Sequence, residues 1–573
     1  MENRRFFLFA IFGALLFFTY QTWKKDHPST VATEPVAIAT AAVAVAATST
    51  EDALPSAPAR ASPESLPAER ASSPSAANTE ARLEVITDKL RIEISLAGGD
   101  LRRAELIGYP ISKDKPNQDL ALLDDRAPHY FILQSGLASA DKPLISANTV
   151  FTAPATRFAL AEGANTLDVR LTATDANGLQ LTKVYRFTRG SYQVVVTQLV
   201  NNTSAVALKA SPYARLQRTP LGAGYEAPFS QTFIGEGFYE QKEPGKYRFK
   251  KISFDDVADE PFETTQTGGW IAMLQHYFVA AILPPAGEQA TFSGKPSTIK
   301  GYLAQYHGPL QDIEPGKTGS YTTQFYVGPK LQGLLDDVAP GFELTEDYGI
   351  LAPIAKPLFW LMKKLHQYTG NWGVAIILLT LLVKGAMYKL SEAQYRSMAR
   401  MKKFTPRIQE IRERHAGDKE KLNKAMMELY TKEKFNPLAG CWPMLVQFPI
   451  FMALYWVLNE SVELRQADFA LWINDLSAPD PFYVLPVLFG ISMWLQQKLG
   501  GQMATMDPMQ QRMMQFMPIA LTAFFAFFPA GLVLYWFVSN LISIAQQWVI
   551  TKKIESEPDK KAASIPAKAS LKK

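Results

Sequence analysis

The chain has 573 residues, too many for one hydrophobic core, so several domains are expected. Its formal net charge is only +5, and its mean hydropathy is near neutral because a polar region before about residue 350 is averaged with a hydrophobic region after it. The single cysteine, Cys441, excludes an intrachain disulfide framework.

The N-terminus contains an apolar segment between two basic pairs. Arg4 and Arg5 precede the apolar run Phe6–Trp23, and Lys24 and Lys25 follow it. This pattern is typical of a signal peptide or of an uncleaved membrane anchor. The only Ala-x-Ala-like sites lie roughly twenty residues beyond the apolar run, whereas cleavage follows the run closely, so we favour an anchor over residues 1–26. Residues 27–81 are almost all Ala, Pro, Ser, Thr, Val and Glu, which predicts a disordered tether.

Residues 82–340 have the pattern of a large all-β sandwich. Apolar residues alternate with polar ones from Leu90 to Leu96, and a hairpin is predicted from Leu167 to Phe187 with its turn at Asn177-Gly178. The apolar run Trp270–Leu283 has only fourteen residues and includes Gln275 and His276, so we expect a buried strand and not a membrane span.

We find no pattern that indicates a metal, a cofactor or catalysis in this region. His129, His276 and His307 are isolated, without the spacing of a metal site, and core or surface roles are the better interpretation. Gly287–Lys295 lacks the glycine spacing of a phosphate loop, and Pro296 stands where serine or threonine should follow the lysine. We therefore expect no enzyme activity and no cofactor.

The region after residue 340 predicts a linker with an interfacial amphipathic helix over 341–370, followed by a membrane core over 371–550. Lysines on one side of Lys356–His366 and apolar residues on the other are typical of a helix lying in the interface. Five membrane spans are expected, and with the anchor they make six: Trp372–Leu390, Asn436–Leu458, Phe482–Leu499, Phe516–Phe528 and Gly531–Ile550.

Polar residues inside two of these spans indicate a hydrated interior. Lys384 lies among apolar residues with Thr380 one turn before it, and Gln447 lies in a span with two prolines. A lysine near the centre of a span costs roughly 2.5–3.5 kcal/mol on insertion scales, so it is expected to face water or a polar partner inside the protein. These residues predict a water-filled pocket within the membrane.

Loop charges predict the topology. Between Lys389 and Lys434 there are thirteen Lys/Arg against seven Asp/Glu, and the basic tail 551–573 is also lysine-rich. Both segments are therefore expected in the cytoplasm, and the acidic loop 459–481 outside. Within the basic loop, residues 391–435 predict a helical hairpin that breaks at Ala416–Asp418. Two interpretations of this hairpin remain open: a solvated connector between spans, or a docking arm for ribosome or client.

Four stretches closely resemble signature sequences of the YidC/Oxa family of membrane protein insertases: NPLAGCWPMLVQFPIFMALY from Asn436, VELRQA from Val462, DPMQQ from Asp507 and FPAGLVLYW from Phe528. The N-terminal half, including Gly268–Phe278, is similar to the periplasmic extension of Gram-negative members. The resemblance implies an inner-membrane protein with both termini in the cytoplasm and a periplasmic sandwich of sugar-mutarotase type without known sugar chemistry. It also implies a five-helix groove that is open to cytoplasm and lipid but closed on the periplasmic face.

Carried over by position, the resemblance implies a client-binding groove around Thr380, Lys384, Gln447, Tyr535 and Trp536. Gram-negative members usually have arginine at the position of Lys384, and Ala439 replaces a usual glycine. Lysine keeps the charge but loses the planar five-donor fork of arginine. The implied partners are nascent membrane proteins, the Sec translocon, the ribosome through the tail and hairpin, and the lipid bilayer, with no specific nucleic-acid sequence.

The resulting hypothesis is an insertase and chaperone for inner-membrane proteins, acting alone or with the Sec translocon. The alternative is a transporter or channel that uses the same polar residues, although the spans show no inverted repeat and no chain of carboxylates. A third interpretation is a periplasmic binding module on a passive anchor.

Overall fold

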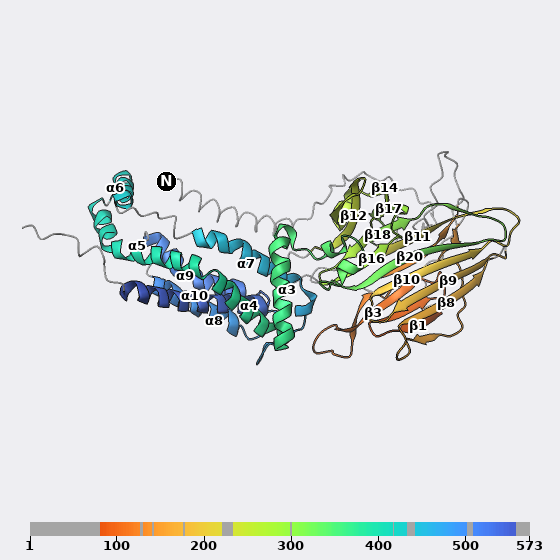
Figure 1. Cartoon of the computed structure of the whole chain (residues 1–573), viewed down its shortest axis with the longest axis horizontal. Helices are drawn as coiled ribbons and strands as arrows, with labels where there is room; N and C mark the ends of the chain where they lie inside the picture. Colours follow the sequence, from red (N-terminus) through yellow and green to blue (C-terminus); the bar gives the residue numbers. More distant parts are fainter. Residues whose placement is uncertain are drawn as a thin grey trace, which may run out of the picture. The chain divides into compact units, whose positions relative to one another are not determined.

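The computed structural model describes residues 81–126, 130–139, 143–175, 178–220, 233–297, 301–415, 417–432, 442–500 and 508–556. Within these ranges, strands occupy the chain from Arg82 to Pro329, and helices dominate from Ala352 to Ser556 (Figure 1). The predicted anchor and nearly all of the predicted tether lie outside the described residues.

The first part is a β-sandwich of two sheets, as predicted. In the order in which they pair, the described strands of the larger sheet are β14 (Phe262–Thr267), β17 (Gln289–Pro296), β18 (Tyr302–His307), β11 (Leu208–Arg218), β5 (Phe131–Ala138), β3 (Leu101–Pro110), β2 (Leu90–Ser95), β1 (Arg82–Ile86) and β7 (Arg157–Ala159), with β4 (Asp119–Leu123), β6 (Pro143–Ile145) and β19 (Gln311–Ile313) attached at its sides. Those of the second sheet are β13 (Lys246–Ser253), β12 (Gly235–Glu243), β15 (Ile271–Leu274), β16 (Phe278–Leu283), β20 (Thr318–Pro329), β10 (Gln193–Asn201), β9 (Gln180–Thr188) and β8 (Thr166–Thr174).

Alternating burial explains why these segments form strands with one face in the core. In β10 every second residue is buried, and in β2 Leu90, Ile92 and Ile94 point inward. The predicted hairpin is confirmed, since β8 and β9 pair antiparallel with Leu167 opposite Phe187. Gly178 has φ 82°, a conformation that glycine adopts easily, while Asn177 lies outside the described residues.

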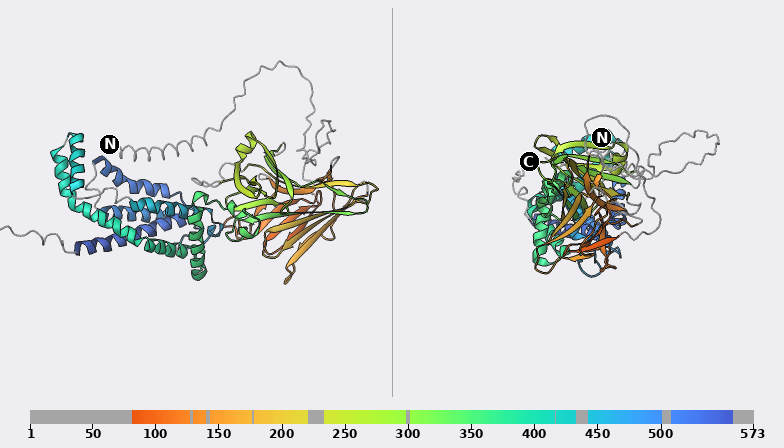
Figure 2. Two further views of the ribbon diagram at one scale, coloured as in Figure 1. Left: turned by 45° about the horizontal axis from the view of Figure 1, so that its top comes forward. Right: turned by 90° about the vertical axis from the view of Figure 1, so that its right-hand side faces the viewer.

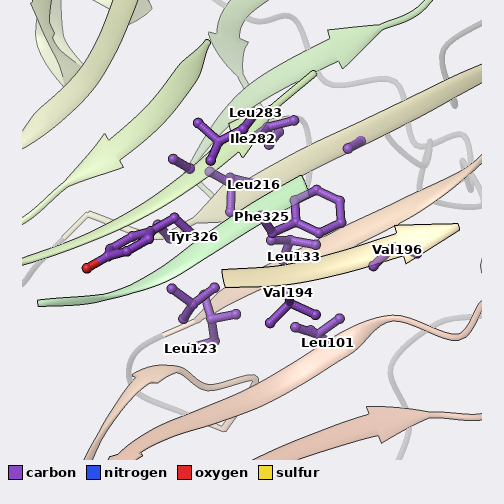
Figure 3. Close-up of a cluster of buried hydrophobic side chains, with 14 of the residues drawn as sticks. Leu101, Leu123, Leu133, Val194, Val196, Leu216, Ile282, Leu283, Phe325 and Tyr326 are labelled. Atoms are coloured by element: carbon purple, nitrogen blue, oxygen red, sulfur yellow. The ribbon is translucent and has the colours of Figure 1, made fainter. Parts of the chain in front are cut away.

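The expectation of one strand over Trp270–Leu283 is wrong in detail. The segment forms two buried strands, β15 and β16, which pair antiparallel with Ile271 opposite Ile282. Both strands are buried on both faces, so the sequence reads as one continuous apolar run although the chain reverses at Gln275–Tyr277. Inward-facing side chains of both sheets form the core that Figure 3 shows, including Leu133 and Leu216 from one sheet and Val194, Ile282 and Phe325 from the other.

The second part is helical. Apart from α2 (Phe254–Asp259) in the sandwich, the described helices are α3 (Ala352–Thr369), α4 (Trp372–Ala386), α5 (Tyr388–Arg414), α6 (Lys419–Lys432), α7 (Trp442–Glu460), α8 (Val484–Gly500), α9 (Pro508–Phe525) and α10 (Ala530–Ser556), with short 3₁₀ turns at Leu335–Asp337, Phe342–Thr345, Gly349–Leu351 and Val462–Leu464. Helix α10 packs against α4, α5, α7 and α8, and α3 packs against α4 and α7 (Figures 1 and 2).

Two predicted spans have different boundaries from those expected. The segment Trp372–Leu390 is not one straight helix, because the chain bends by 63° between α4 and α5 at Met387. The short segment Phe516–Phe528 is not a separate helix: Phe516–Phe525 is the end of a longer helix, α9, which begins at Pro508, and residues 526–528 lie in the turn that follows it. By length and composition, one described helix, Ala530–Ile554, qualifies as a membrane span, and the bent pair Trp372–Ala386 and Tyr388–Ser397 qualifies as a second when taken together.

The loop after α7 joins the helical part to the sandwich. Val462 belongs to the sandwich core, and the Arg465 side chain donates a hydrogen bond of 2.9 Å to the carbonyl oxygen of Pro110. Burial raises the pKa of Glu463 in this loop to about 7, and it raises the pKa of nearby Glu346 to about 8, with a smaller contribution from the charge of Glu463. Ionising either carboxyl group therefore opposes the packing of this loop.

This burial predicts a pH-dependent junction. The pKa of Glu463 is higher in the folded protein than its ordinary value of 4.5, so its contribution to stability is complete below about pH 4.5 and is lost as the pH rises through 7. In Glu463→Gln, we expect the unfolding midpoint in detergent to fall less between pH 5.5 and 8.0 than in the unmodified chain. Glu162→Gln, at an exposed position, is the control. An equal fall in all three proteins would contradict the prediction.

Candidate functional site

A polar cavity of about 300 Å³ lies among α4, α5, α7, α8 and α10, and we call it the groove. Its walls combine one cation with amide, hydroxyl and aromatic side chains, and these are Lys384, Ser391, Gln394, Tyr395, Gln447, Phe448, Phe451, Gln496, Tyr535, Trp536, Ser539, Asn540 and Ser543. Polar groups in such number inside otherwise apolar helices require partners or water, because an unpaired polar group in hydrocarbon costs several kcal/mol.

Lys384 is the central charge of the groove. Its side chain leaves the last turn of α4 and is only 7% exposed, and its Nζ donates a hydrogen bond of 2.9 Å to the Ser543 hydroxyl on α10. Among the described residues no carboxylate oxygen lies within 4.0 Å of this ammonium group. The nearest turn of α5 has an acid, Glu392, but that carboxylate is bonded to Arg396. In the described part of the chain, the Lys384 ammonium therefore has a neutral hydrogen-bond partner, Ser543, and no ion-pair partner.

Neighbouring hydrogen bonds fix the position of this cation. The Ser543 hydroxyl donates to the Ser539 carbonyl oxygen at 2.8 Å, and the Tyr395 hydroxyl donates to the Ser543 carbonyl oxygen at 3.2 Å. Gln546 donates to the Lys384 carbonyl oxygen at 3.3 Å. These bonds join α4, α5 and α10 around the charge, so the lysine is oriented by its surroundings even without an ion pair.

Aromatic rings form the other wall of the groove. Phe451 on α7 stacks on Trp536 with ring centroids 5.1 Å apart, and the centroid of Tyr535 lies 6.5 Å from that of Phe451. Phe448 is 59% exposed, so the aromatic side of the groove continues to the surface of the helices. A peptide in the groove would therefore touch polar groups on one side and rings on the other.

Four of the five residues predicted for the site lie together in this cavity: Lys384, Gln447, Tyr535 and Trp536. The fifth, Thr380, is 1% exposed and donates its hydroxyl to the Ile376 carbonyl oxygen at 2.6 Å, so it satisfies its own helix and does not line the groove. Client binding by these residues stays a prediction.

Sequence reasoning missed several groove residues that have a detectable signal. The signal on α10 is a spacing of three to four residues that starts from the predicted residue Trp536 and continues through Ser539 or Asn540 to Ser543. This spacing places the residues on one face of an apolar helix. Gln394 and Tyr395 gave no such signal, because α5 is polar over much of its length and its polar residues do not stand out.

The described histidines of the sandwich contact other groups of the protein. His276 Nε2 lies 2.9 Å from the Asn459 carbonyl oxygen, and His307 is stacked against Tyr213 with ring centroids 6.5 Å apart. Burial lowers the pKa of each to about 4. His129 lies outside the described residues, and in the described part of the chain no three His, Cys, Asp or Glu side chains come together as a metal site would require.

Comparison with known proteins assigns both parts of the chain. The family model of the 60Kd inner membrane protein matches residues 364–557, and that of the YidC periplasmic domain matches residues 82–361. A protein of Nitrosococcus oceani named membrane protein insertase YidC is 44% identical over 560 residues, which cover 97% of this chain and 100% of the relative. A protein of the same name from Methylococcus capsulatus is 44% identical over 475 residues, or 83% of this chain and 86% of the relative.

A solved structure, described as an active YidC insertase with its first transmembrane domain resolved, covers 82% of this chain and 92% of its own at 17% identity, with a TM-score of 0.36. The two sequence relatives match this chain over most or all of their length, and the two family models meet near residue 362. The resemblance predicted from the signature stretches is thereby confirmed. The chain belongs to the YidC family of membrane protein insertases.

Proposed function

We propose that this chain inserts other polypeptides into a bacterial inner membrane by receiving their polar segments in the groove. The observation that carries the proposal is the buried ammonium of Lys384 in a polar cavity, with a serine hydroxyl as its partner. A buried cation with no acid beside it attracts an acidic or polar segment more strongly than one already paired. The names of its relatives support the same function.

The mechanism requires no bond-making chemistry by this protein. A client's polar flank enters the groove and exchanges hydrogen bonds with water for bonds with amide and hydroxyl groups, which lowers the cost of moving that flank toward the other side. The client's apolar helix leaves along the rings of α7 and α10 into lipid. Transfer of roughly twenty apolar residues from water to hydrocarbon supplies the driving force.

The finer organisation is part of this proposal. It comprises six spans with both termini in the cytoplasm, a periplasmic sandwich over 82–340, a linker and interfacial helix over 341–370, the core over 371–550 and a basic tail over 551–573. Helices α5 and α6, which flank Gly417 (φ 102°), would form the cytoplasmic hairpin within 391–435. The basic tail and hairpin would contact the ribosome, and the chain would insert its clients and help them fold either alone or with the Sec translocon.

Purified chain in vesicles tests the function. We expect vesicles containing it to insert a single-span client, measured by protection of the client's outer tail from added protease, and empty vesicles to fail. A second chain without residues 82–340 is expected to retain insertion if the helical part alone is sufficient for it. Failure of both chains would contradict the insertase assignment, and ion or solute flux without insertion would favour the transporter alternative.

A further inference from the structure

A second, larger cavity lies at the other end of α7, and we call it the outer pocket. It has a volume of about 690 Å³ and is formed by the end of α7, the loop between α7 and α8, and the turn between α9 and α10. Sandwich residues 111–114, His276 and Tyr277 also contribute to it. Asn459, Asn474 and Gln466 give it polar surface, and Tyr455 and Trp472 give it rings. Its size lies within the ~300–1,000 Å³ typical of ligand sites.

Helix α7 runs from the groove to the outer pocket. Gln447 and Phe451 line the groove, and Tyr455 and Asn459 line the outer pocket. These four residues recur every four positions, so each lies about one turn beyond the one before it and is rotated by ~40° around the helix. At 1.5 Å of rise per residue, Gln447 and Asn459 are ~18 Å apart along the helix axis, compared with ~30 Å for the hydrocarbon core of a bilayer.

A cluster of rings contributes side chains to both cavities, and we call it the ring layer. Its centre is Trp536, whose ring centroid lies 3.8 Å from that of Phe525, 5.1 Å from Phe451, 6.0 Å from Phe489 and 6.2 Å from Phe528. Trp536 and Phe451 line the groove, while Phe528 lines the outer pocket. Packed rings of this kind exclude water and ions at rest, as hydrophobic constrictions do in channels.

We propose that the outer pocket receives the client's polar segment after that segment has passed from the groove through the ring layer. The inference rests on the proposed function and adds a route to it. Along this route a polar segment meets side-chain amides before the rings, at Gln447 and Asn540, and after them, at Asn459 and Asn474. A route through lipid offers no such partners. Passage of the segment requires the rings of α7, α8, α9 and α10 to separate, and the packed state returns when the segment has left.

Disulfide cross-linking tests the route. The single native cysteine is first replaced in Cys441→Ser, and one cysteine is then placed on the groove side in Gln447→Cys, or on the outer side in Tyr455→Cys or Asn459→Cys. Ile491→Cys, at a position that is 56% exposed on α8, is the control outside the route. The client is a single-span protein with one cysteine in its outer tail. It is released from the ribosome as a series of chains of increasing length.

We expect short client chains to cross-link to Gln447→Cys and longer ones to Tyr455→Cys and Asn459→Cys, at least fivefold above Ile491→Cys. Two outer positions are used so that misfolding of one variant does not leave the question open. If the client tail becomes protected from protease while neither outer position cross-links above the control, the route is wrong although the insertase function stands. If the Cys441→Ser chain protects no client, the proposed function itself fails.

Discussion

Replacing Lys384 with glutamate is expected to reduce the insertion of a client with an acidic flank by at least about tenfold, a loss of ~1.4 kcal/mol, because placing like charges together at an interface costs several kcal/mol. The effect follows from the geometry of the groove, in which the ammonium is buried and donates a hydrogen bond to the Ser543 hydroxyl. With glutamate at this position the client's acid would meet a second acid at a largely buried position.

The same experiment includes a conservative change. Lys384→Arg keeps the positive charge and adds donors, so insertion of the acidic-flank client is expected to stay within about twofold of the unmodified chain, a difference of at most ~0.4 kcal/mol. The measurement is the fraction of client protected from protease in vesicles that contain equal amounts of each variant.

A matched client separates charge from structure. When the acidic residues of the flank are changed to the corresponding amides, Lys384→Glu is expected to insert the client nearly as well as Lys384→Arg does. A loss that is equal for both clients would point to damage of the groove, and equal insertion of the acidic client by both variants would remove the electrostatic role of residue 384.

The sandwich could be predicted from sequence because its strands are half-exposed. Where one face of a strand is accessible to solvent, as in β8, β9 and β10, polar and apolar residues alternate. This alternation predicts both the strand and its register. The hairpin β15–β16 could not be resolved, because neither face is exposed and its turn, Gln275–Tyr277, contains no glycine, proline or asparagine.

The groove was predictable only where a polar residue stood out against an apolar span. Lys384 and Gln447 do so, and both line the cavity. Thr380 has the same signal, but a threonine hydroxyl can bond to the carbonyl four residues earlier, and sequence alone does not decide between that bond and a cavity. The bend at Met387 also lacked a signal, since no proline marks it.

Lys183 is the second position where a single change is expected to have a large effect, here on the stability of the sandwich. Its side chain is fully buried on β9, and its Nζ donates to the carbonyl oxygens of Gly98, Gly99 and Ser135 at 3.0, 2.8 and 2.8 Å. It also lies 4.0 Å from the carboxylate of buried Asp100. One ammonium group thus ties β9 of the second sheet to the β2–β3 turn and β5 of the larger sheet.

Lys183→Met removes the charge at similar length. It takes a hydrogen-bond donor from three carbonyl oxygens and one of two nearby cations from Asp100, so the sandwich is expected to lose about 3–5 kcal/mol of unfolding free energy, as when one partner of a buried pair is removed. Pulse proteolysis of the full chain across a urea series measures this loss.

Lys209→Met, whose lysine side chain is 57% exposed, is the control and should change stability by less than ~0.5 kcal/mol. Adding Asp100→Asn should recover part of the loss, because it removes a buried negative charge that has lost one of its two nearby cations and keeps only Arg102. If Lys183→Met is as stable as the control, these bonds do not join the sheets in the way their geometry indicates.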